Sequence, residues 1–126
     1  MGVGKTVLAQ GIGRGWGALE PLISPTFVLV REHHRPDGNQ TLLHVDFYRL
    51  EGAEEGLSLG LEDWLEDPRV VVLIEWPERA PDLLPPERLW IRLDFADTER
   101  RRLLFTALGP AYLRLLQDFR RAAFGV

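Results

Sequence analysis

The chain has 126 residues, a net charge of −4 at pH 7 and no cysteine. This length allows one domain with a hydrophobic core, and the lack of thiols excludes disulfides, thiolate metal ligands and cysteine nucleophiles. The acidic balance argues against the basic surface with which proteins neutralise nucleic-acid phosphates. No apolar run approaches the ~20 residues that cross a bilayer, and no signal peptide is recognisable, so we expect a soluble cytoplasmic protein with no membrane partner.

The first residues fit the second half of a phosphate-binding loop. Residues 2–6 read G-V-G-K-T, the end of the pattern G-x-x-x-x-G-K-[ST]. In such a loop the backbone N–H groups surround a triphosphate, the lysine contacts the outer phosphates and the hydroxyl binds Mg²⁺. The first glycine of the pattern would precede Met1, so we expect the chain to lack the opening of the loop and the strand before it. The alternative is a glycine-rich tail with an incidental lysine.

The residues after the loop predict a helix and a β-hairpin. Apolar residues at helical spacing indicate a helix over 6–19, although four glycines weaken it. Two β-rich segments, 27–31 and 41–47, flank a Pro-Asp-Gly-Asn turn and predict an antiparallel pair within an otherwise parallel sheet. His33 and His34 lack ligand spacing to any partner and are interpreted as loop residues.

The second half of the chain adds two strands and two helical segments. Residues 70–74 are five consecutive aliphatic residues, typical of a strand buried on both faces, and we place them at the centre of the sheet. Residues 89–95 alternate as a half-buried strand does, while 51–66 and 110–123 have helical patterns. The elements predict an α/β fold of the P-loop NTPase type. It would be a three-layer sandwich with a mixed, mostly parallel central sheet, N-terminally truncated, and one domain over residues 1–126.

A carboxylate ends the most aliphatic segment of the chain. Glu75 follows residues 70–74, and P-loop proteins place a metal-binding acid at the carboxyl end of a central strand. Because Mg²⁺ takes oxygen ligands, we expect Thr6 and Glu75 to hold it together. The alternative is an acid at a strand end that only faces water.

Residues 44–49, with the sequence H-V-D-F-Y-R, form the densest polar cluster. On a strand, His44, Asp46 and Tyr48 share one face and would point toward solvent or a cleft. Asp46 is a candidate for orienting an attacking water or holding a metal-bound water, and Arg49 for neutralising phosphate charge. The alternative is an exposed hairpin face whose side chains pair with surface neighbours.

Two further features are weaker candidates. Residues 24–27, S-P-T-F, place two hydroxyls around a rigid proline and suggest a switch loop in which Thr26 reaches the metal or the terminal phosphate, although such turns are common. Trp76 follows Glu75 and is a candidate for stacking on a ligand, but an aromatic residue beside a core strand more often packs in the interior.

Taken in order, five segments closely resemble the TsaE family, formerly called YjeE. The resemblance spans about residues 1–95 and implies a bacterial P-loop ATPase that hydrolyses ATP in the presence of Mg²⁺. It also implies that this ATPase works with the TsaB and TsaD proteins, and only indirectly with tRNA, to make threonylcarbamoyladenosine in tRNA. ATP hydrolysis would support repeated cycles of synthesis. The segments are GVGKT (2–6), SPTF (24–27), HVDFYRL (44–50), GLEDW (60–64) and EWPE (75–78).

The resemblance also assigns roles to single residues. It implies ATP and Mg²⁺ as cofactors, with Thr6 and Glu75 on the metal and with Asp46 and Glu75 as catalytic residues. Arg100 comes from a weakly matching stretch that approaches the base in relatives. The implied nucleotide-binding residues are Gly2, Val3, Gly4, Lys5, Thr6, Thr26 and Arg100.

Two other functions stay open at this point. The same loop also serves small-molecule kinases, although no lid-length, arginine-rich insertion separates the motifs. The other is a domain that has lost nucleotide binding and acts as an interaction module.

Overall fold

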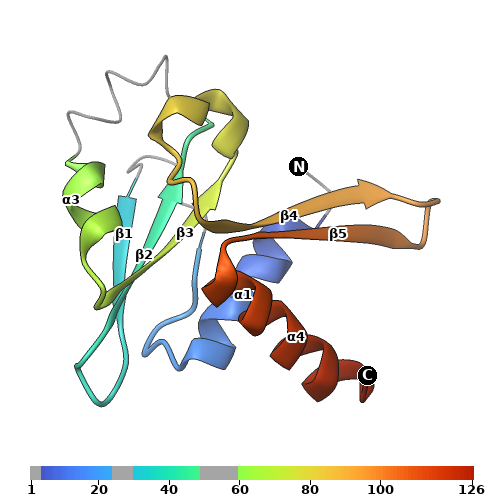
Figure 1. The fold of residues 1–126 in the computed structure, drawn as a ribbon, viewed down its shortest axis with the longest axis horizontal. Coiled ribbons are helices and arrows are strands. Elements are labelled where there is room, and N and C mark those ends of the chain that lie inside the picture. The colour runs from blue at the N-terminus through green and yellow to red at the C-terminus, as the bar shows by residue number, and fades with distance from the viewer. Residues whose placement is uncertain (1–3, 24–29, 49–59) are drawn as a thin grey trace. The chain divides into compact units, whose positions relative to one another are not determined.

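The structure is a computed structural model that describes residues 4–23, 30–48 and 60–126. These residues form two compact units, 4–84 and 85–126, and each is described by itself (Figure 1). The first unit contains α1 (Lys5–Trp16), β1 (Val30–His34), β2 (Thr41–Asp46), α3 (Leu61–Glu66), β3 (Val70–Glu75) and two short 3₁₀ helices, Pro77–Arg79 and Pro81–Leu83. The second unit contains β4 (Arg88–Phe95), β5 (Arg101–Leu108) and α4 (Pro110–Phe124).

Helix α1 begins at Lys5, within the phosphate-binding motif, and confirms the predicted helix. It ends at Gly17, which has a left-handed backbone and donates its N–H to the carbonyls of Gly13 and Arg14. The glycines inside the helix are not equivalent. A Cβ at Gly13 would overlap the fully buried side chain of Leu22, whereas a Cβ at Gly11 would meet open space. Gly13 therefore allows the chain after α1 to pack closely against the helix.

Strands β1, β2 and β3 form one mixed sheet in that order. The predicted antiparallel pairing is confirmed, because β1 pairs with β2 and Gly38 adopts φ 69° in the turn between them. The first strand extends to His34, beyond the predicted segment 27–31, of which residues 27–29 lie outside the described residues. Strand β3 runs parallel to β2, in the register that pairs Thr41 with Val70 and Asp46 with Glu75. The first unit is thus an α/β fold with a mixed sheet.

The core of the first unit lies around β2. The side chains of Leu43 and Val45 point to one face of the sheet and are fully buried in a cluster with Leu61 of α3. Leu42 and His44 point to the other face and are also fully buried. Both faces of β2 are therefore covered, and Figure 1 shows α3 and α1 on opposite sides of the three strands.

The structure corrects the expected place of residues 70–74. In the described part of the chain, these residues lie in β3 at the edge of the sheet, next to β2, and their side chains are half-buried or exposed. The central strand is β2, which has a histidine and an aspartate in its sequence. An aliphatic run indicates that the side chains of a strand pack against apolar residues. Which strand is paired on both edges depends instead on pairing between segments that are distant in the sequence.

The interpretation of His33 and His34 as loop residues is also wrong. Both lie in β1, where they pair with Leu42 and Thr41 of β2. His33 is only 4% exposed. Alternation along the strand turns His33 toward the face of the sheet that carries Leu42, while His34 stays exposed.

The second unit is an antiparallel hairpin with a helix. Strand β4 confirms the predicted strand, and its partner β5 was not predicted. Helix α4 confirms the predicted closing helix and packs on β5 through Phe119, whose ring centroid lies 5.5 Å from that of Phe105. Of the acidic segment 51–66, residues 61–66 form α3 and residues 51–59 lie outside the described residues. Among the helices that the structure describes, none is both long enough and apolar enough to cross a membrane.

Candidate functional site

The N-terminus of α1 supplies the positive end of the candidate site. Gly4 occupies the N-cap position with φ 109°, a left-handed conformation that favours glycine, and no side chain of the described residues caps the helix there. The first turn contains no acidic residue. Its free N–H groups and the helix dipole therefore favour an anion, and half-buried Lys5 and exposed Thr6 stand at the same turn. Gly2 and Val3 lie outside the described residues.

Two carboxylates lie side by side where β2 and β3 end. Asp46 and Glu75 are direct partners in the parallel register. The pairing continues past the strands, because the Phe47 N–H donates to the Glu75 carbonyl over 2.9 Å. The Asp46 Oδ1 accepts the Tyr48 N–H over 2.8 Å, and Asp46 is only 9% exposed. Carboxyl ends of parallel strands are where α/β sheets bind ligands.

The expectation that His44, Asp46 and Tyr48 emerge together toward solvent or a cleft is wrong for His44. Its side chain is fully buried, and its Nε2 lies 2.7 Å from Oε2 of Glu75, whose side chain is 10% exposed. Because a carboxylate only accepts, the imidazole N–H is the donor. Strand β2 ends at Asp46, so Tyr48 lies beyond the strand and is exposed. The alternative of an exposed hairpin face is excluded as well.

Trp76 connects the helix end to the carboxylates. The Lys5 Nζ lies 3.6 Å from the centroid of the Trp76 ring, and the centroid of the Tyr48 ring lies 5.0 Å from that of the same indole. The Arg79 guanidinium carbon lies 5.3 Å from the Tyr48 ring centroid. Since Trp76 directly follows Glu75, the motif lysine and the strand-end acid occupy the same end of the sheet.

The backbone of Trp76 is unusual. With φ 59° and ψ 48° it is left-handed, and it is the only non-glycine residue with positive φ in the part of the chain that the structure describes. Such a conformation costs about 1–3 kcal/mol and concentrates at functional sites. The sequence analysis treated Trp76 only as a weaker candidate and did not include it among the site residues. Its place after a strand-ending carboxylate was the signal for including it.

The donor set at this end of the sheet fits Mg²⁺. Mg²⁺ is commonly held by one or two carboxylates together with phosphate and water oxygens. Glu75 and Asp46 provide neighbouring carboxylates, and Thr6 adds a hydroxyl in the first turn of α1. Among the described residues there is no group of three or more His, Cys, Asp and Glu side chains that could hold a metal alone. The set thus suits a metal shared with phosphates better than an all-protein site.

The structure does not test the other predicted residues at this end of the sheet. Thr26 and Arg49 lie outside the described residues. Arg100 belongs to the second unit, between β4 and β5, where its Nε lies 2.7 Å from Oδ2 of Asp97. Their contacts with a nucleotide stay predictions.

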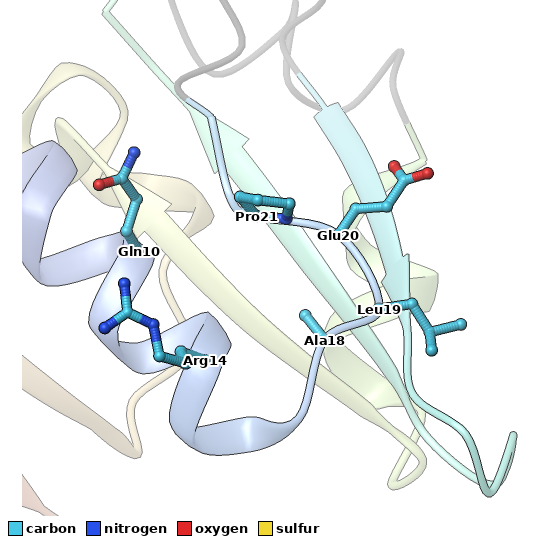
Figure 2. Close-up of a pocket in the computed structure, with 6 residues that line it drawn as sticks. All are labelled: Gln10, Arg14, Ala18, Leu19, Glu20 and Pro21. Carbon is cyan, nitrogen blue, oxygen red and sulfur yellow. The ribbon is translucent and has the colours of Figure 1, made fainter.

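The first unit also contains a cavity of about 430 Å³, which Lys5, Asp46 and Glu75 do not line. Figure 2 shows that its lining comes from α1 and from the loop that follows this helix. None of the predicted site residues that the structure describes lines it, and Lys5 is at the other end of α1. The lining residues are Gln10, Arg14, Ala18, Leu19, Glu20 and Pro21.

Comparisons with known proteins bear on the whole chain. Residues 1–103 match the family described as "Threonylcarbamoyl adenosine biosynthesis protein TsaE". The chain is 36% identical to the tRNA threonylcarbamoyladenosine biosynthesis protein TsaE of Bacillus subtilis, over 96% of this chain and 73% of that protein. It is 40% identical to the TsaE proteins of Streptomyces coelicolor and of a Nostoc species, over 89% and 84% of this chain and 78% and 65% of those proteins.

A solved structure agrees with these matches. The crystal structure of YdiB from Bacillus subtilis superposes with a TM-score of 0.72 at 30% identity, covering 96% of this chain and 72% of that one. The family match covers residues 1–103, which include the helix end and the strand ends that form the candidate site. The chain belongs to the TsaE family.

Proposed function

We propose that this protein is the ATP-binding and ATP-hydrolysing component of the machinery that makes threonylcarbamoyladenosine in tRNA, and that it acts in the cytoplasm with TsaB and TsaD. The names of the relatives support the pathway. The observation that carries the ATPase assignment is the contact between Lys5 and Trp76, because it joins the N-terminus of α1 to the strand end that bears Glu75. A P-loop NTPase-like fold accounts for this arrangement.

The site residues suggest three separate roles: phosphate binding, metal binding and orientation of the attacking water. The N–H groups at the start of α1 and the Lys5 ammonium bind the phosphates, where the helix dipole and the lysine charge both favour an anion. Thr6 and Glu75 hold Mg²⁺, which neutralises charge that develops on the phosphates. Asp46 lies beside Glu75 and orients the attacking water, which it can do because its Oδ1 is fixed by the Tyr48 N–H.

ATP binding is tested first by thermal unfolding of the full chain. A ligand that binds only the folded state at 100 times its Kd stabilises the protein by about 2.7 kcal/mol, so Mg·ATP should raise the Tm clearly. Lys5→Met should lose most of this shift, because it removes the ammonium and keeps the length of the side chain. An absent shift in the wild-type protein would overturn the nucleotide assignment.

Hydrolysis and pathway are tested by reconstitution. We expect Mg²⁺-dependent release of phosphate that increases when TsaB and TsaD are added, together with repeated synthesis of threonylcarbamoyladenosine on tRNA. The Asp46→Asn variant should bind ATP and fail in both reactions. Phosphate transfer to an added small molecule in place of water would instead identify a kinase.

A further inference from the structure

His44 contacts a proposed metal-binding residue at the candidate site but has no part in the proposed function. Its imidazole is fully buried on β2 and its Nε2–H donates to Oε2 of Glu75 over 2.7 Å. The other ring nitrogen, Nδ1, is also buried and has no hydrogen-bond partner among the described residues. The ring therefore has a single polar contact there, and that contact is with the proposed metal-binding carboxylate.

This contact makes the two carboxylate oxygens of Glu75 different in their hydrogen bonding. Oε2 is occupied by His44, whereas Oε1 accepts no hydrogen bond from any residue that the structure describes. The terminal torsion of a glutamate is broad, so an unrestrained carboxylate turns easily and presents either oxygen. A donor held in a close-packed interior removes this freedom, because the His44 ring cannot move without disturbing β2.

The neighbouring carboxylate is held in a comparable way. The Asp46 Oδ1 accepts a backbone N–H, that of Tyr48, over 2.8 Å. Each of the two acids thus accepts at least one hydrogen bond from the protein, Asp46 from the main chain and Glu75 from a buried side chain. A carboxylate already bound through one oxygen is suited to bind Mg²⁺ through the other alone, which matches the strict octahedral geometry of this ion.

We propose that His44 is a positioning residue that orients Glu75 so that Oε1 binds the metal. This inference rests on the proposed function, since it concerns the metal of the same site. Donors that hold a metal-binding carboxylate typically contribute 10–100-fold to metal affinity or activity. The expected consequence of losing this donor is a specific defect in Mg²⁺ use, with nucleotide binding in the absence of metal unchanged.

The test compares three variants of the full chain. His44→Gln can place an amide N–H near the position of Nε2. His44→Asn has a shorter side chain whose amide does not reach Glu75, and His44→Leu has no donor at all. For each protein we would measure ATP affinity in EDTA by calorimetry and the affinity of the ATP complex for Mn²⁺ by electron paramagnetic resonance. The Mg²⁺ concentration at half-maximal hydrolysis and the Tm complete the set.

The expected result distinguishes loss of the hydrogen-bond donor from loss of the folded structure. His44→Asn and His44→Leu should need about 10–100-fold more divalent cation, and His44→Gln should stay within a few-fold of the wild-type protein. All four should have similar ATP affinity in EDTA. Donor-free variants with the wild-type cation requirement would overturn the proposal. So would an equal loss of metal-free ATP affinity, or failure of both donor-free variants to fold, because the contact would then be structural.

Failure of the proposed function gives a different result. In that case the wild-type protein itself would bind no ATP or would hydrolyse it without a divalent cation, and the role of His44 would fail with it. If the wild-type protein requires Mg²⁺ and the donor-free variants require no more, only the role of His44 is lost.

Discussion

The ammonium of Lys5 lies 3.6 Å from the centroid of the Trp76 ring, on the face of the indole. A cation–π contact of this kind is worth about 0.5–2 kcal/mol, depending on how far the pair is removed from water. Phosphates that bind at the start of α1 would compete with the indole for the same ammonium. Nucleotide binding should therefore change the environment of Trp76.

Tryptophan fluorescence can report this change. The chain has four tryptophans, and we expect Mg·ATP to alter the emission of the wild-type protein but not that of Trp76→Phe. Phenylalanine keeps an aromatic face for Lys5 and removes the indole signal, so affinity should change only a few-fold. The unchanged Trp16, Trp64 and Trp90 provide the internal control. An equal emission change in both proteins would place the signal elsewhere.

The hydrogen bond between His44 and Glu75 makes the choice of substitution at Glu75 important. Glu75→Ala leaves the buried His44 N–H without an acceptor and should destabilise the fold by about 1–3 kcal/mol. Glu75→Gln keeps a side-chain oxygen that can accept this bond and should cost less, while both variants lose Mg²⁺-dependent hydrolysis. Urea unfolding measures the free energies. Thr6→Ala, at an exposed position, is the control and should stay within about 0.5 kcal/mol of the wild-type protein.

The glycines of α1 provide a matched pair for packing. Gly13→Ala places a methyl group against the buried side chain of Leu22, and overpacking of this kind costs about 1–3 kcal/mol. Gly11→Ala meets open space and should stabilise the helix by about 0.5–1 kcal/mol. The Tm of the two variants should therefore move in opposite directions. If the Tm of both variants rises, the Leu22 side chain can shift to accommodate the added methyl group, and the predicted overpacking is wrong.

His33 should make stability depend on pH. Burial lowers the pKa of His33 below its usual value, and the charges of His44 and Arg31 lower it further, while Glu20 acts in the opposite direction. The folded state therefore keeps this ring neutral in a range where the unfolded chain, with a pKa of about 6.5, already binds a proton. Stability should be fully present above about pH 6.5 and fall as the pH decreases through the lowered pKa of the folded state.

Unfolding by urea at a series of pH values checks this expectation. His33→Gln should weaken the loss of stability between neutral and mildly acidic pH. His34→Gln, at the exposed neighbour whose charge has the smallest effect on the pKa of His33, should change it much less. Equal pH profiles for the wild-type protein and His33→Gln would assign the dependence to other groups.

The elements predicted from the sequence are those with local patterns. Apolar spacing and a first-turn proline indicate α1 and α4, and alternation indicates β4. Strand β5 was missed because it begins with Arg101 and Arg102, lacks alternation and gains its structure by pairing with β4. The central position of β2 was also missed, since strand order depends on which distant segments pair.

The same distinction applies to the candidate site. Motif spacing pointed to Lys5, Asp46 and Glu75, and the parallel register of β2 and β3 explains why the two acids are neighbours. The contact between His44 and Glu75 joins residues 31 positions apart, and no local pattern encodes it. Alternation along a strand predicts on which face of the sheet a side chain lies. It does not predict whether other elements cover that face.

Strand β2 places His44 and Asp46 in a fully buried segment of the first unit. Every side chain from Leu42 to Phe47 is buried, and both edges of the strand are paired. Backbone amides in such a segment exchange with deuterium only when the whole unit opens. His44 and Asp46 should therefore keep their positions when a nucleotide binds, and among the described site residues the adjustment is expected at Gly4, Lys5 and Trp76.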